Sequence, residues 1–305
     1  MRVTAFLLGG VLLALATGLQ VALEAAHERA ARANQAREDT PESVMVPALR
    51  LLAVPFPEVA ADITWLRAVQ YFARFRHSRA SADDRTLSAL IDLAVTLDPN
   101  FVAAYRTGAV LVAEPPPMGP GQAQVAVGLL EKGIEEHPSR WELLFDKGFL
   151  QYRSLRKYDQ AAASFLRASR MTGAPWWLRP LAASTLAEGG RRAAARALWR
   201  AQLRESQLSW MREQAERRLE QLDVLDSINR LQRVVDAARA SGQRRPYSWD
   251  ALRAAGRIQA APRDPEGTPY MLDPMNGRVE LSPTSPLAPL PVEGGFVSRQ
   301  GRTTK

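Results

Sequence analysis

A 34-residue stretch in the middle of the chain is followed by a second with the same pattern, and this repeat restricts the fold more than any other feature. Residues 142–175 and 176–209 align so that small residues recur where two helices must cross and large ones recur where a core must be filled. The matched pairs are Gly148 with Ala182, Tyr152 with Leu186, Ala161 with Ala195, and Phe165 with Trp199. One such helix pair cannot bury its apolar face alone, so repeats of this kind stack against their neighbours. The sequence therefore predicts a mainly α solenoid of helix pairs.

Further copies of the pattern precede this repeat. Residues 102–114 match its first helix, with Gly108 in the place of Gly148, and a proline-rich insert then breaks the period. Pro99 and Pro138 mark equivalent helix ends, because proline cannot continue a helix and biases the residue before it away from one. About four units result, which is more than the three that a stable array normally needs.

These units resemble the tetratricopeptide repeat (TPR), a helix–turn–helix of 34 residues. The resemblance covers about 60–209 and is clearest in 142–209, whereas Gln202 stands where a small residue is expected. Together with the apolar N-terminus, it is similar to a group of bacterial membrane-anchored TPR proteins. The resemblance implies a tetratricopeptide-type helical solenoid. We expect a non-enzymatic scaffold that binds a protein partner in the bacterial cell envelope.

The N-terminus carries an apolar run over residues 4–26, with no charged side chain between Arg2 and Glu24. At a rise of about 1.5 Å per residue, this run is long enough to cross about 30 Å of hydrocarbon. We therefore expect a single-pass anchor in the cytoplasmic (inner) membrane, with the bulk of the chain on the periplasmic side. The alternative is a cleaved signal peptide, since Ala14-Leu15-Ala16 fits a small-residue cleavage site.

The end of the chain changes character after the helices. Ser248 is placed to N-cap a short helix, and Asn276-Gly277 is a strong signal for a β-hairpin between two short strands. The segment 262–282 resembles the globular end of type II secretion pseudopilins. Two interpretations stay open: the hairpin covers the end of the solenoid, or the protein is an assembly factor of a pilus or secretion apparatus. The predicted organisation is an anchor over 1–26, a linker over 27–55, repeats over 56–209, a capping helix over 210–242, a helix plus hairpin over 243–283, and a disordered tail over 284–305.

The sequence offers no recognisable reactive site. It lacks cysteine, which excludes thiolate catalysis and cysteine-bound metals, and His27, His77 and His137 have no second ligand at a suitable spacing. We find no phosphate-binding loop or nucleophile motif, so we expect no catalytic residue, metal, cofactor or small-molecule substrate. The net charge of +8 comes mainly from arginines scattered among acidic residues, which argues against nucleic-acid binding. An enzyme of unrecognised type is a further alternative.

A partner surface is expected on the first helix of each unit, which lines the concave face in such solenoids. Side chains of mixed charge and partly apolar character suit an extended peptide or a partner helix. The alternative is that the two leucines of this set pack between units and the arginines form only local ion pairs. The candidate residues are Arg106, Val110, Leu143, Asp146, Leu150 and Arg153.

Overall fold

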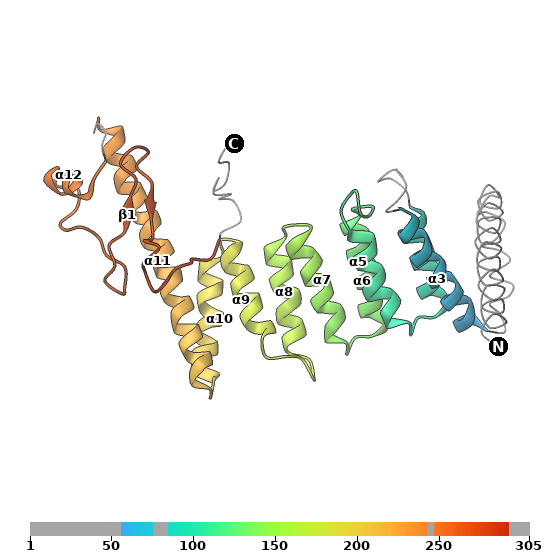
Figure 1. Cartoon of the computed structure of the whole chain (residues 1–305). Helices are drawn as coiled ribbons and strands as arrows, with labels where there is room; N and C mark the ends of the chain where they lie inside the picture. The colour runs from blue at the N-terminus through green and yellow to red at the C-terminus, as the bar shows by residue number, and fades with distance from the viewer. Residues whose placement is uncertain (1–55, 76–84, 243–246, 293–305) are drawn as a thin grey trace, which may run out of the picture. The chain divides into compact units, whose positions relative to one another are not determined.

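The computed structural model describes residues 56–75, 85–242 and 247–292, and this part of the chain is mainly α-helical (Figure 1). The chain divides into two units between Ile63 and Thr64, inside the first described helix. The helices are α3 (Pro57–Phe75), α4 (Thr86–Leu97), α5 (Val102–Ala113), α6 (Ala123–Glu136), α7 (Trp141–Arg153), α8 (Tyr158–Ser169), α9 (Leu178–Glu188), α10 (Arg192–Glu205), α11 (Ser209–Ala240) and α12 (Trp249–Ala254). The strands are β1 (Met271–Leu272) and β2 (Val279–Glu280).

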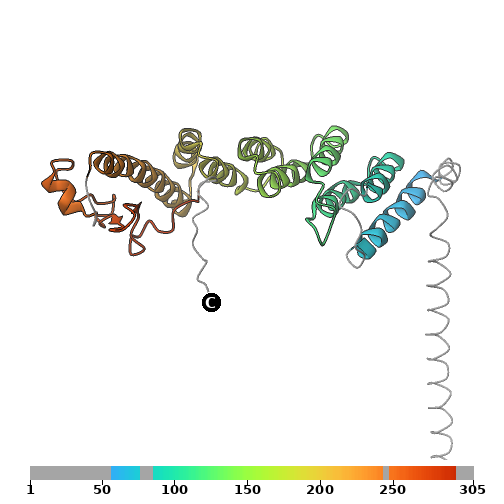
Figure 2. The same cartoon turned by 90° about the horizontal axis from the view of Figure 1, so that it is seen from above.

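The helices between α4 and α11 pack in sequence order, each against the next (Figures 1 and 2). One apolar core runs from Ala68 to Ala182, and a second joins α9 and α10 to the first half of α11. The prediction of a mainly α fold is confirmed, and the consecutive packing is consistent with an α solenoid. None of the helices in the described ranges is both long and apolar enough to cross a membrane. The predicted anchor and linker, residues 1–55, lie outside those ranges.

Small residues allow the close crossings inside each helix pair. A Cβ atom added at Gly148 would lie 2.6 Å from Cε1 of Phe165, and one added at Gly133 would lie 2.9 Å from the ring of Tyr105. Ala161 is fully buried where α8 meets α7, and its carbonyl oxygen is 3.1 Å from the same Cβ position of Gly148. The alanine and glycine positions that the repeat singles out are therefore contact points between helices.

The 32-residue helix α11 is shared by two cores. Its first half packs on α9 and α10, whereas Val224, at its middle, and Val235, near its C-terminal end, join a separate core formed with the C-terminal segment. There β1 pairs antiparallel with β2. Gln232 fastens this sheet to α11, because its Oε1 accepts the N–H of Val279 at 2.9 Å and its Nε2 donates to the carbonyl of Gly277 at 3.0 Å.

The local signals of the C-terminal segment have clear structural counterparts. The hydroxyl of Ser248 accepts the N–H of Ala251 at 3.1 Å and so caps α12, as predicted. The connection between the strands is longer than a two-residue turn: the Oδ1 atom of Asp273 accepts the N–H groups of Met275 and Asn276. Gly277 closes this loop at φ +74, a conformation that favours glycine.

The prediction of a disordered tail from residue 284 is wrong for 284–292. This strap, defined as residues 284–292, crosses α11 in an ordered conformation and buries Leu287 in the C-terminal core. The buried amide of Gln221 donates to the carbonyls of Leu287 at 2.8 Å and Pro289 at 3.0 Å. Arg217 donates to the carbonyl of Ala288 at 3.1 Å. These donors satisfy the backbone of a segment that forms no helix or strand, which is why a proline-rich sequence is ordered here.

Candidate partner-binding surface

Two of the six predicted contact residues form an ion pair between neighbouring first helices. Arg106 on α5 donates through Nε to Oδ2 of Asp146 on α7 at 2.5 Å, and through Nη2 to Oδ1 at 3.4 Å. The arginine side chain is 41% exposed and the aspartate only 16%. Burial raises the pKa of Asp146, and the hydrogen bond from Arg106 opposes that effect. The same hydrogen bond raises the pKa of the Arg106 guanidinium and so favours its charged form.

The two predicted leucines do not belong to any accessible surface, and this part of the prediction is wrong. Leu143 is 0% exposed and Leu150 is 5% exposed, and both lie in the core that runs through the helix pairs. The physical reason is the environment of α7, which packs on helices at both sides and therefore has more than one apolar face. The alternative reading of these leucines, as core residues, is the one that the structure supports.

The exposed apolar residues of this region are Val110 on α5 and Phe149 on α7, with 52% and 40% of their surfaces accessible. Val110 was among the predicted residues, whereas Phe149 was missed. Phe149 lies three residues after Asp146 and four before Arg153, which is the spacing of neighbours on one helix face. Phe149 could have been predicted as a surface residue from this spacing. Arg153 is also exposed.

These placements define the α5–α7 surface, which consists of Arg106, Val110, Asp146, Phe149 and Arg153. It combines two exposed apolar side chains with a partly buried ion pair and one further exposed cation. Exposed aromatic and arginine side chains are enriched at protein interfaces. The surface is suited to contact with another protein by burial of Val110 and Phe149.

A second exposed aromatic feature lies at the N-terminal ends of α9 and α11. The rings of Trp176 and Trp210 meet edge to face with their centroids 4.9 Å apart, and both residues are exposed. Leu208, two residues before Trp210 in the sequence, is exposed as well. Since large apolar side chains gathered at a surface commonly mark contact sites, this patch is a further candidate for partner contact.

The described residues contain no group of three histidine, cysteine, aspartate or glutamate side chains arranged to hold a metal ion. His137, the one histidine within those ranges, places Nε2 2.8 Å from the carbonyl oxygen of Pro99 and so ties the C-terminal end of α6 to the turn between α4 and α5. His27 and His77 lie outside the described residues.

A comparison with protein-family models finds no match for this chain, and a comparison with curated proteins finds none either.

Proposed function

We propose that this protein is a non-enzymatic scaffold of the tetratricopeptide type that binds a protein partner through the α5–α7 surface. The observation that carries the proposal is the exposure of Val110 and Phe149 on neighbouring helices, next to the Arg106–Asp146 pair. Apolar side chains held at fixed positions on a rigid helical array provide contact area without a cost in backbone ordering.

The proposal includes a tether. Residues 4–26 anchor the chain in the cytoplasmic membrane, and the helical part lies on the periplasmic side. The support is the length of the apolar run and the short charged stub before it. In this arrangement the scaffold holds its partner close to the surface of the cytoplasmic membrane.

Site-specific photo-crosslinking tests the surface in the full-length chain. A photoreactive phenylalanine analogue replaces Val110 or Phe149, and the same analogue at Ala163 on α8 and Ala197 on α10 provides matched exposed controls. We expect a discrete adduct from the first two positions and none from the controls. Adducts only from the control positions, or equally from all four, would show that the partner contacts another surface.

A further inference from the structure

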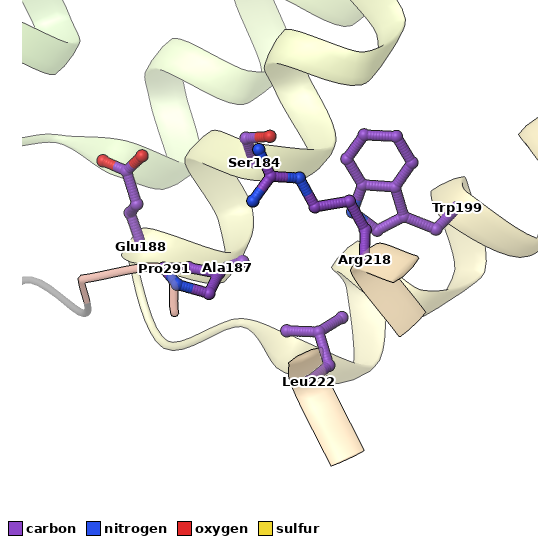
Figure 3. A pocket seen from close by; sticks show the side chains of 7 residues that line it. All are labelled: Ser184, Ala187, Glu188, Trp199, Arg218, Leu222 and Pro291. Atoms are coloured by element: carbon purple, nitrogen blue, oxygen red, sulfur yellow. The ribbon is translucent and has the colours of Figure 1, made fainter. Parts of the chain in front are cut away.

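The last helix pair of the array is covered by segments of its own chain. The first half of α11 packs on α9 and α10, and the cleft that remains there is lined by Trp199, Leu222 and Pro291 of the strap (Figure 3). Solenoids need such terminal covers, because an end repeat otherwise leaves an apolar face in water. The first described helix, α3, has no comparable cover in the described ranges, since it exposes a row of large apolar side chains.

This row, the α3 stripe, follows one face of the helix. The exposed fractions of its side chains run from 39% to 66%, and its members are Phe56, Val59, Ile63, Leu66 and Val69. The opposite face of the same helix is packed, because the side chains at that face, Ala61, Thr64 and Ala68, are all 0% exposed. α3 therefore has two faces that avoid water, and the described residues cover only one of them.

The spacing of the stripe is that of a two-stranded coiled coil. Its first four members follow one another at steps of three, four and three residues, which is the alternation of a and d positions in a heptad repeat. Ile63 then occupies an a position and Leu66 a d position, the combination that favours two parallel strands. A seam of this kind packs best against a second helix with the same seam.

Two charged residues beside the stripe favour a parallel pair. Asp62 is at a g position and Arg67, five residues later, at an e position, so they lie on opposite edges of the seam. In a parallel, in-register pair the g residue of one helix meets the e residue five positions later in the other, so Asp62 faces Arg67 twice. An antiparallel pair brings like edges together and loses both contacts. Within 56–75, Asp62 is exposed and Arg67 half-buried.

The chain that precedes the stripe favours the same direction. Residues 27–55 separate the proposed anchor from Phe56, the first residue of the stripe. Two copies anchored in one membrane therefore enter α3 from the same end. The membrane also raises the effective concentration of one copy for the other, which matters because two heptads are short for a coiled coil in solution. This second argument rests on the proposed tether, whereas the argument from charge does not.

We propose that the α3 stripe pairs with the same stripe of a second copy of this chain, as a parallel two-stranded coiled coil. Phe56, Val59, Ile63 and Leu66 form its seam, and Asp62 of each copy pairs with Arg67 of the other. An interface of this kind has twofold symmetry, so each seam residue meets its own counterpart. The dimer forms through α3 and leaves the α5–α7 surface of each copy to its partner.

Disulfide trapping of the full-length chain in membranes tests the pairing, and a chain without cysteine makes each introduced thiol unambiguous. Val59→Cys and Leu66→Cys should each give a linked dimer on mild oxidation, because a d residue in a parallel pair faces itself. Val125→Cys on α6 is the matched control, a valine 49% exposed against 55% for Val59, and should stay unlinked. An antiparallel pair can link at most one of the two d positions, and a stripe covered by residues 27–55 or by lipid links neither. Either result would overturn the proposal.

Charge reversal then tests the edges of the seam. In the Leu66→Cys background, Asp62→Arg and Arg67→Asp each place like charges across the dimer, so each should lower the linked fraction by about fivefold, the effect of two exposed ion pairs. Co-expression of the two variants with different tags should restore linkage as a heterodimer, because both cross-pairs then unite opposite charges. Heterodimers no more abundant than either homodimer would refute the parallel pairing. Loss of the Val110 adduct with intact trapping at Val59 would reject only the proposed partner surface.

Discussion

Replacement of Gly148 by alanine should destabilise the protein although alanine is the better helix former. In an open helix interior the change stabilises by about 0.8–1 kcal/mol. Here the new Cβ would lie 2.6 Å from Cε1 and 2.7 Å from Cδ1 of Phe165, and 3.1 Å from the carbonyl oxygen of Ala161. The ring is fully buried and the carbonyl belongs to the backbone of α8, so neither gives way easily. Overpacking of this kind costs about 1–3 kcal/mol. The overpacking cost outweighs the gain in helix propensity, and we expect a net loss of up to about 2 kcal/mol.

Gly128 supplies the matched control for this experiment. It lies inside α6, is exposed, and has no atom within 4 Å of its Cβ position, so Gly128→Ala should stabilise by about 0.8–1 kcal/mol. Urea denaturation followed by circular dichroism compares both variants with the wild type. Phe165→Leu combined with Gly148→Ala should recover part of the loss, because the smaller side chain frees space. A Gly148 variant as stable as the Gly128 variant would refute the close crossing of α7 and α8.

Four other perturbations test the core, the ion pair and the membrane anchor. Phe165→Ala should cost about 3–5 kcal/mol by leaving an unfilled cavity, and Ala161→Leu about 1–3 kcal/mol by overpacking; both appear as lowered denaturation midpoints. Arg106→Glu should lower the melting temperature because it removes the partner of the mostly buried Asp146 carboxylate, whereas the exposed Arg153→Glu should change it little. Deletion of residues 1–26 should release the protein from membranes that otherwise retain it during a carbonate wash; release of the intact chain by the wash would contradict the anchor.

The helices were predictable because their signals are local. Apolar spacing places an amphipathic helix, and the prolines at 99 and 138 end the preceding helices within one or two residues of the observed ends. The glycines and alanines of the repeat were assigned to helix crossings, and the positions of Gly148 next to Phe165 and of Gly108 next to Ile91 agree with that assignment. These features depend on a few neighbouring residues and on the 34-residue period, both of which are visible in one sequence.

The sequence did not predict which individual residues of the first helices are exposed. On α7, Leu150 is buried and the adjacent Phe149 is exposed, a difference of one position or about 100° around the helix. Because α7 contacts both α6 and α8, apolar residues occur on most of its circumference, and periodicity alone cannot tell which of them remains free. Each first helix packs against other helices on two sides and faces solvent on a third. A pattern that separates only apolar from polar residues does not distinguish these three environments.

The strap was missed for a different reason. Nothing within 284–292 predicts order; its contacts come from distant residues, among them Gln221, which is 66 residues away from Leu287. Gln221 and Gln232 are polar residues on the packed sides of α11. Each amide donates a hydrogen bond to the backbone of the C-terminal segment, which accounts for a polar residue at that position. Polar side chains in the packed rows of α11 thus mark contacts that the local sequence does not reveal.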